Sequence, residues 1–454
     1  MSEPYALDIF FGARRAAVLS HQPQEGSYDL QYTDDWTRSA QAFAFAPGLP
    51  MDRPIGSAAV RRFLENLLPE GRALDVASVH WNIQKTNVFA LVRELGRETT
   101  GALTFLPAGQ APESIQAVSR EISYEELQAR IADRNQTPFN VWDGKVRMSV
   151  AGYQDKLLVQ KAGERLYLVD GSLSSTHILK PEPLNKDLRH MVANEHFCMR
   201  LASAVSRRVL RTPFVAQVEI LRVPDPVLAV RRFDRIVEVT GGPLVGPSAV
   251  DRRHIIDGCQ LLDMPPTMKY ERNLGSGRDV MNIRDGVSLP RLFAAKDLLA
   301  VPAIAVRQLS FWSALTLLLG NSDAHGKNIS FHVGPQGIRV AELYDLVSVQ
   351  PYGKKVVDHD LAMAYGDEFE LAKVTSFALA DHCVRSGIDR NFFSRLLTQV
   401  AQAAAQEALE LVNDPIYTEQ ERETVRGIAH GIAARAEVLL AAAKDVPTYK
   451  ADDF

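Results

Sequence analysis

The feature of this sequence that most constrains its fold is a change of hydrophobic pattern near residue 250. Before it, short β-type runs alternate with turn signals. Residues 156–159 and 165–169, for example, flank a short Gly-containing turn, which predicts a β-hairpin. After it, apolar residues recur at helical spacing, as along residues 392–400. The chain is therefore expected to adopt an α+β fold in which a helical lobe follows a β-rich one.

We expect three parts, at residues 1–140, 141–250 and 251–454, and this number suits a chain of 454 residues. The first part combines a small antiparallel sheet within residues 1–50 with helices, one of them over residues 87–95. The second is β-rich, and the third is mainly helical. The sequence contains no internal repeat.

The middle part carries a strand over residues 176–180, and Pro181 and Pro183 end it because proline cannot donate to a sheet ladder. A helix over residues 187–205 and a strand pair within residues 215–230 are expected to follow. The most apolar stretch, residues 309–319, is too short to span a bilayer and reads as a buried helix.

Composition excludes several classes of protein. The 51 basic and 55 acidic residues give a net charge of −4, so the strongly basic footprint of a nucleic-acid binder is absent. Cys198, Cys259 and Cys383 lie far apart, which argues against a zinc site or a disulfide framework and favours the cytoplasm. The N-terminus lacks a basic region followed by an apolar run, so we expect no signal peptide and no membrane association.

The segment from Asn321 to Asn328, Asn-Ser-Asp-Ala-His-Gly-Lys-Asn, contains the strongest chemical signal. Asn328 follows Asp323 by five positions, the spacing of a kinase catalytic loop, in which the Asp orients the acceptor hydroxyl and the Asn binds magnesium. Asp345 follows 22 positions after Asp323, with apolar neighbours that suit a metal ligand at a strand end. Taken singly, these residues could equally be turn and capping residues. Their order favours phosphoryl transfer.

Two further features fit a nucleotide site. Lys180 ends a strand and Glu195 lies on the next helix, the arrangement of the phosphate-binding lysine of kinases and its glutamate partner. A lone lysine before proline is otherwise most often a surface charge. The small-residue loop at residues 149–156 could turn backbone N–H groups toward phosphates, or be a plain turn.

Other phosphate-binding motifs fail. Residues 320–327 resemble a Walker loop, but five residues instead of four separate its glycines, and Asn328 stands where Ser or Thr is required. Residues 275–277 lack a third glycine in register, and neither His-Arg-Asp nor Asp-Phe-Gly occurs in the expected order. The chain is therefore not an ordinary eukaryotic-type kinase.

In several of its segments the chain resembles the HipA-type serine/threonine kinases, the toxins of bacterial HipBA toxin–antitoxin pairs. The resemblance runs over nearly the whole chain and implies a two-lobed, protein-kinase-like α+β fold with an N-terminal α+β subdomain. The segments that carry it are residues 63–69, 101–103, 149–156, 176–180, 194–202, 232–235, 323–328, 344–345 and 361–364.

The resemblance implies a role for each matching residue. Asp323 would be the catalytic base, Asn328 and Asp345 would hold Mg²⁺, and Ser149 would be the autophosphorylated serine whose modification inactivates the kinase. The residues that would bind ATP are Ala151, Gly152, Tyr153, Gln154, Asp155, Lys156, Lys180, Arg231, Arg232, Phe233, His325, Gly326, Lys327, Asn328, Tyr344 and Asp345. Among these, the residues 151–156 would form the loop over the phosphates, and 231–233 the hinge beside adenine.

The chain departs from the family at Tyr153 and Asp155, where a smaller residue and Glu are expected, and at Arg231, which replaces an acidic hinge residue. The resemblance further implies a HipB-like helix-turn-helix antitoxin, operator DNA bound mainly through that antitoxin, and a protein substrate such as the glutamyl-tRNA synthetase. Phosphorylating that substrate would block translation. A catalytically weak corepressor and a small-molecule kinase remain as alternatives.

Overall fold

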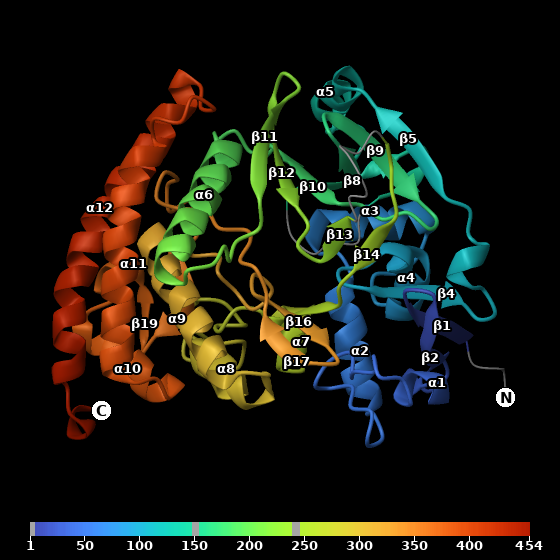
Figure 1. Ribbon diagram of the computed structural model, residues 1–454, viewed down its shortest axis with the longest axis horizontal. Helices are drawn as coiled ribbons and strands as arrows, with labels where there is room; N and C mark the ends of the chain where they lie inside the picture. Colours follow the sequence, from blue (N-terminus) through green and yellow to red (C-terminus); the bar gives the residue numbers. More distant parts are fainter. Residues whose placement is uncertain (1–4, 148–153, 238–245) are drawn as a thin grey trace.

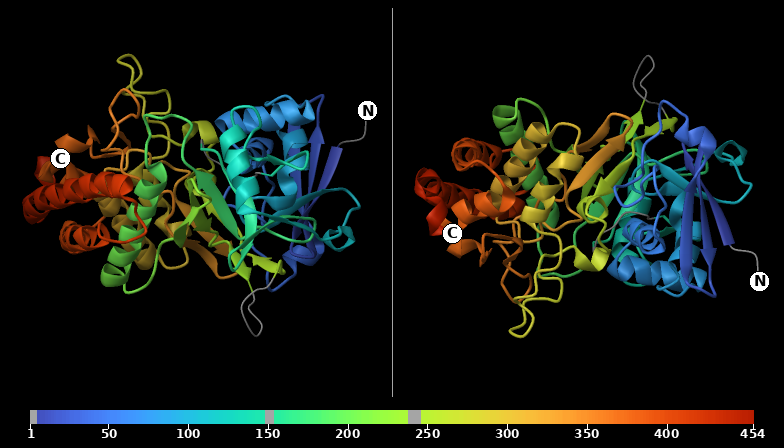
Figure 2. Two further views of the ribbon diagram at one scale, coloured as in Figure 1. Left: turned by 90° about the horizontal axis from the view of Figure 1, so that it is seen from above. Right: turned by 90° about the horizontal axis from the view of Figure 1, so that it is seen from below.

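The computed structural model describes residues 5–147, 154–237 and 246–454. The N-terminal unit and the last helices lie at opposite ends of the long axis, with a β-rich lobe between them (Figure 1). Views from above and below show the same order of parts (Figure 2). The expected α+β architecture is confirmed.

The N-terminal unit is built on a four-stranded antiparallel sheet of order β3-β2-β1-β4. Helices α2 and α4 pack on it because their apolar residues recur on one face, which buries Val60, Phe63 and Leu91. The elements are β1 (Tyr5–Phe11), β2 (Arg14–Gln22), β3 (Ser27–Tyr32), α1 (Asp34–Thr37), α2 (Ser57–Leu67), α3 (Gly71–Trp81), α4 (Val88–Leu95) and β4 (Leu103–Pro107).

The middle lobe contains a six-stranded antiparallel sheet of order β11-β12-β10-β8-β9-β5. The predicted hairpin is β8 and β9, and the strand expected before Pro181 is β10. The elements are β5 (Val118–Ile122), α5 (Tyr124–Asp133), β6 (Val141–Trp142), β7 (Lys145–Val146), β8 (Leu157–Ala162), β9 (Arg165–Asp170), β10 (His177–Pro181), α6 (Met191–Val209), β11 (Val218–Arg222) and β12 (Pro226–Arg231).

The middle lobe begins earlier than the expected boundary at residue 140. Strand β5 pairs with β9, and Leu127 and Ile131 of α5 share a buried cluster with Leu157 and Leu166 of the sheet. Residues 118–133 therefore belong to this lobe in space. Strand β5 is short and mostly exposed, and its pattern does not indicate its partner β9, which begins 43 residues after β5 ends.

The C-terminal lobe is mainly helical, as expected. Strands also occur in it: β15 and β16 are followed by β17 in one small sheet, and β18 pairs with β19. The elements after β12 are β13 (Arg235–Val237), β14 (Val250–Arg252), β15 (Ile255–Asp257), α7 (Gly258–Leu261), α8 (Leu289–Ala294), α9 (Pro302–Leu319), β16 (Ser330–Gly334), β17 (Gly337–Val340), β18 (Asp360–Tyr365), β19 (Glu368–Glu370), α10 (Ser376–Ser386), α11 (Arg390–Leu411) and α12 (Glu419–Asp445).

Helix α9 forms the centre of this lobe. Leu309 is fully buried, and so are Phe311, Leu315 and Leu318, which lie on the opposite face of the helix. Among the described residues α9 is the one helix long and apolar enough to cross a membrane, but 67% of that stretch is buried inside the protein. Its apolar character is thus explained by its place in the core, as expected for residues 309–319.

Candidate active site

A cleft of about 740 Å³ lies where the six-stranded sheet faces the C-terminal lobe. This volume suits a nucleotide-sized ligand. Most of the expected site residues come together here. Those that line the cleft are Gln154, Lys156, Lys180, Arg231, Arg232, Phe233, Asp323, His325, Lys327, Asn328, Tyr344 and Asp345.

Lys180 joins the two walls of the cleft. From β10, its Nζ lies 2.6 Å from Glu195 Oε1 on α6 and 2.5 Å from Asp345 Oδ1 of the C-terminal lobe. Burial would lower the pKa of Lys180, but the two carboxylates outweigh it and raise that pKa well above its ordinary value. The ammonium group is therefore held in place by two carboxylates and stays charged at neutral pH. The alternative of a loose surface lysine is wrong.

Asp345 is held ionised. Burial would raise its pKa, but Lys180 and Lys156 outweigh burial and hold the pKa of Asp345 well below the usual range. Its backbone has a φ of +56°, in the left-handed region that few residues other than glycine adopt. Such strained backbone is retained where the surrounding structure demands a particular side-chain direction. Lys156 itself is buried in the same cluster.

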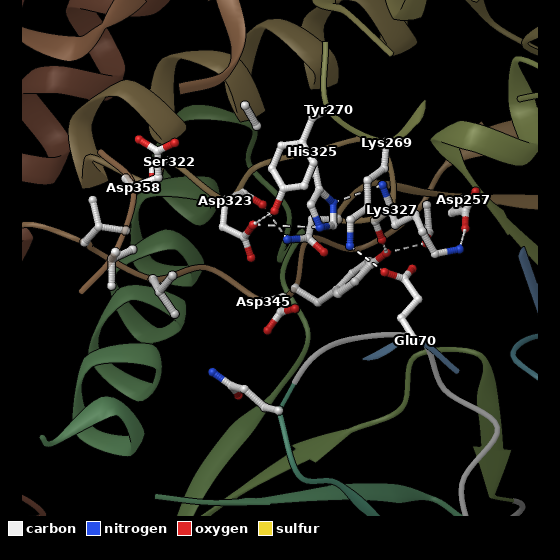
Figure 3. Close-up of a pocket in the computed structure, with 18 of the residues that line it drawn as sticks. Glu70, Asp257, Lys269, Tyr270, Ser322, Asp323, His325, Lys327, Asp345 and Asp358 are labelled. Carbon is white, nitrogen blue, oxygen red and sulfur yellow. Dashed lines mark hydrogen bonds and ion pairs between the residues drawn. The ribbon is translucent and has the colours of Figure 1, made fainter. Parts of the chain in front are cut away.

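Asp323 sits at the other side of the cleft, where half of its side-chain surface remains accessible. Its enclosure by the protein raises its pKa to about 6. The hydroxyl of Tyr270 donates a hydrogen bond of 2.5 Å to its Oδ1, and Figure 3 shows the two side chains directed toward each other. The Asp323 carboxylate is thus both reachable and basic enough to accept a proton near neutral pH.

Asn328 is tied to the same loop. Its Nδ2 donates to the backbone carbonyl of Asp323 at 2.6 Å, so its Oδ1 is the amide atom left to coordinate a cation. Asn328 and Asp345 together supply an amide oxygen and a charged carboxylate, which are the ligands that Mg²⁺ prefers. No cluster of three or more His, Cys, Asp or Glu able to hold a metal occurs in the described residues. A pair of protein ligands completed by water and phosphate oxygens is typical of magnesium in kinases.

His325 and Lys327 support the loop between Asp323 and Asn328. Burial lowers the pKa of His325 to about 3, so the imidazole is neutral. Lys327 lines the cleft, but its Nζ is bound to Asp257 Oδ2 at 2.5 Å and to Asn66 Oδ1 at 3.0 Å. Lys327 therefore holds the loop in place more than it reaches for a ligand. His325 also has a contact within the loop, where its Nδ1 accepts from the N–H of Lys327 at 3.2 Å.

Gly326 does not line the cleft, in contrast to the expectation. Its N–H donates to the carbonyl of Lys269 at 2.9 Å, and its own carbonyl accepts from Gly258 at 2.8 Å. A Cβ atom at this position would lie 2.7 Å from the Val287 side chain. Glycine is needed here for close packing of the loop.

Residues 231–233, which were expected to form the hinge, line the cleft, and their side chains make different contacts. The Arg232 guanidinium is buried and is bound to Asp234, with Nη2 2.8 Å from Oδ2. The N–H groups of Arg231 and Arg232 already donate to Gln217 and Thr176. Phe233 is the one of the three that offers an apolar ring, with its centroid 5.6 Å from that of Tyr344.

The loop expected over the phosphates is described only from Gln154 onward. Ser149, Ala151, Gly152 and Tyr153 lie outside the described residues. Asp155 does not line the cleft and lies 4.0 Å from the guanidinium of Arg134 instead.

Several residues of the cleft were not predicted from sequence patterns. The N-terminal unit contributes Asn66 and Glu70, and Glu70 forms an ion pair of 2.5 Å with Lys269 beside Tyr270. Asn66 lies within the segment 63–69 that carried part of the resemblance, but no role was attached to it. These residues are distant in sequence from the loop at residues 321–328, and only folding brings them to it.

The fold and the cleft define a kinase-like protein of two lobes, and comparisons with known proteins agree. The family model of the HipA-like C-terminal domain matches residues 148–408, and that of the HipA N-terminal domain matches residues 7–106. The chain belongs to the HipA family.

Relatives match over most of their length. The serine/threonine-protein kinase toxin HipA of Shewanella oneidensis is 38% identical over 407 residues, which cover 89% of this chain and 89% of that protein. The putative kinase Y4mE of Sinorhizobium fredii is 30% identical over 442 residues, which cover 95% of this chain and 98% of the relative. The structure of Shewanella oneidensis HipA with HipB and operator DNA superposes with a TM-score of 0.86 at 36% identity, and covers 98% of this chain and 100% of that one.

Proposed function

We propose that this protein is an ATP- and Mg²⁺-dependent serine/threonine-protein kinase and the toxin of a HipBA-type toxin–antitoxin pair. The observation that carries the proposal is the convergence of Lys180, Asp323 and Asp345 on one cleft, each in the ionisation state that phosphoryl transfer needs. The 38% identity to a kinase toxin over nearly the whole chain supports it.

Each group has a task in this proposal. The Lys180 ammonium contacts the nucleotide phosphates, and Glu195 holds it in place. Asn328 and Asp345 would hold Mg²⁺, which when bound would neutralise the charge that develops on the phosphates. Asp323 accepts the proton of the acceptor hydroxyl as the oxygen attacks the γ-phosphorus and the bond to the β-phosphate oxygen breaks, leaving ADP. The rings of Phe233 and Tyr344 lie where an adenine could pack.

One of the hydroxyl groups that would accept the phosphoryl group belongs to the protein itself. We assign Ser149 as the site of inactivating autophosphorylation, on the resemblance of its segment to the family. The client protein is proposed to be an aminoacyl-tRNA synthetase such as the glutamyl enzyme, whose phosphorylation would inhibit translation in the bacterial cytoplasm.

The proposed partner is a HipB-like helix-turn-helix antitoxin, which would make most of the contacts to operator DNA. The similar Shewanella oneidensis structure, which contains HipA, HipB and operator DNA, supports this assignment. The net charge of −4 agrees with a chain that leaves DNA binding mainly to a partner.

Radiolabelled ATP with Mg²⁺ and the purified protein tests the proposal. Wild type is expected to label itself or a protein substrate, and Asp323→Asn is expected to label neither. If wild type transfers no phosphate to any protein yet binds operator DNA with its partner, it is a corepressor and the kinase assignment is wrong. Labelling of a small molecule alone would instead identify a small-molecule kinase.

A further inference from the structure

We propose that Tyr270 is a positioning residue for the catalytic carboxylate: it fixes Asp323 through Oδ1, so that Oδ2 is presented to the acceptor hydroxyl. The inference rests on the proposed kinase function and deepens it. Tyr270 lies 53 residues before Asp323 in the chain, and its hydroxyl donates to Asp323 Oδ1 at 2.5 Å. Among the described residues no hydrogen bond engages Asp323 Oδ2, so this oxygen is left to accept a proton.

The phenol of Tyr270 is suited to this role because it stays neutral. Burial and the neighbouring Asp323 both raise the pKa of Tyr270 far above its usual value, so its hydroxyl keeps its proton and acts as a donor. A hydrogen bond to a charged acceptor is stronger than one between neutral groups. The bond therefore restricts the Asp323 side chain to one orientation.

The backbone that carries Tyr270 is fastened to the catalytic loop. The preceding carbonyl, that of Lys269, accepts a hydrogen bond of 2.9 Å from the N–H of Gly326 in that loop. On the other side, the N–H of Glu271 donates to Ala362 at 3.0 Å, and Glu271 Oε1 lies 2.5 Å from Arg284 Nη2. Tyr270 is thus anchored before it and after it, so its hydroxyl meets Asp323 at a fixed place.

The side chain of Tyr270 is also held from its flank. Its ring meets His325 edge to face, with centroids 4.9 Å apart at 88°. The ammonium group of Lys269 lies 5.5 Å from the ring centroid and is paired with Glu70 of the N-terminal unit. Figure 3 shows Tyr270 standing over His325, with its hydroxyl at Asp323. The ion pair between Glu70 and Lys269 thereby links the N-terminal unit to the ring of Tyr270, which in turn orients Asp323.

Tyr270 is also accessible from the cleft, because it lines the cleft and keeps 37% of its surface exposed. The hydroxyl of a buried tyrosine usually finds a hydrogen-bond partner inside the protein. Tyr365 is such a case: it is 2% exposed, and its hydroxyl donates to the carbonyl of Ser313. The contrast supports a task for Tyr270 at the site.

The test is Tyr270→Phe, which removes only the hydroxyl, assayed alone and combined with Asp323→Ala in single-turnover phosphotransfer at saturating ATP and Mg²⁺. A lost hydrogen bond to a charged group predicts a rate about 10- to 100-fold below wild type. The affinity for ATP and the Tm should stay unchanged. The Asp323→Ala protein is compared by the small residual single-turnover rate that remains without the base. Because Tyr270 acts through Asp323, Tyr270→Phe should cause no further loss of that residual rate.

Tyr449→Phe is the matched control, since it removes a phenol hydroxyl bonded to Ser376 far from the cleft, and its rate should equal that of wild type. A wild-type rate for Tyr270→Phe would overturn the inference alone, and so would an equal loss in both Asp323 backgrounds or a parallel loss of ATP binding. Absence of phosphotransfer by wild type would overturn the proposed function and this inference together.

Discussion

Lys180 Nζ lies 2.5 Å from Asp345 Oδ1, although 165 residues separate the two in the chain. Lys180 belongs to the β-rich lobe and Asp345 to the C-terminal lobe, so this ion pair bridges the cleft. The same ammonium group also pairs with Glu195, so both carboxylates depend on Lys180 to neutralise their charge. Lys156 is a second positive charge that acts on Asp345. The first prediction follows from this dependence.

Lys180→Met should abolish phosphotransfer and weaken ATP binding by at least tenfold, because the phosphates lose their cation. It should also lower the free energy of unfolding by about 3–5 kcal/mol, since removing one partner leaves a buried charge uncompensated. Adding Glu195→Gln should restore most of the stability but none of the activity. Chemical denaturation and isothermal titration with ATP measure the two effects.

Lys145→Met serves as the control for that experiment, because Lys145 pairs with Asp170 while 56% of its side chain is exposed. Exposed pairs of this kind contribute little to stability. If Lys180→Met were as stable as this control, the buried pair would not have the role assigned to it.

Asp323→Asn should abolish both phosphotransfer and growth arrest on induction while leaving the fold intact. Asn has nearly the shape of Asp but cannot accept a proton, and half of the Asp323 side chain is accessible, so no buried core is disturbed. Growth after induction, in-vitro labelling and circular dichroism check the three parts. Full toxicity from a folded Asp323→Asn protein would contradict the mechanism.

Asp234→Asn should destabilise the protein by about 3–5 kcal/mol, because Asp234 neutralises two fully buried guanidinium groups. Its Oδ2 lies 2.8 Å from Arg232 Nη2 and 2.6 Å from Arg235 Nη1, and it also accepts from the N–H of Gly101 in the N-terminal unit. Thermal denaturation measures the change. Asp251→Asn, an exposed carboxylate on β14, should leave the Tm unchanged. Equal Tm values for the two variants would show that the buried cluster is not stabilising.

The stability of the protein should fall steeply as the pH drops from about 6.5 toward 4. Burial lowers the pKa of His177 and His382 to about 3, and that of His196 and His254 to about 4. The unfolded chain therefore binds protons below pH 6.5 that the folded protein does not. The contribution of these histidines to the free energy of unfolding is therefore fully present above about pH 6.5. Below that pH it falls by up to about 1.4 kcal/mol per histidine per pH unit.

His382→Gln should make this pH dependence shallower by nearly one proton, as measured by urea denaturation between pH 7 and pH 4.5. The same substitution at His430, an exposed position on α12, should leave the slope unchanged. Equal slopes for wild type and His382→Gln would mean that His382 takes up its proton in the folded state.

Ser149→Ala should prevent inactivating self-phosphorylation, so that the variant stays active and is at least as toxic as wild type. Intact-mass spectrometry after incubation with ATP and Mg²⁺ should find the added phosphate on wild type and not on the variant. Asp323→Asn, which keeps Ser149, should also carry no phosphate. An unchanged phosphate load on Ser149→Ala would place the modification elsewhere.

The sequence by itself determined the parts that depend on local patterning. Alternation and turn residues indicated the hairpin of β8 and β9, helical spacing indicated α4 and α11, and the spacing from Asp323 to Asn328 indicated the candidate loop. Each of these signals spans a few residues whose neighbours in the chain are also neighbours in space. Such patterns can be read without knowing the rest of the molecule.

Only the tertiary structure decided which distant groups meet. It put β5 beside β9, buried Arg232 against Asp234, and brought Tyr270 to Asp323. It also joined Lys180 to Asp345, which turned a lysine that could have been a surface charge into a buried bridge between lobes. These contacts depend on packing between elements far apart in the chain, and no spacing in the sequence encodes them. Burial and neighbouring charge, which set the pKa values of the cleft, exist only once that packing is complete.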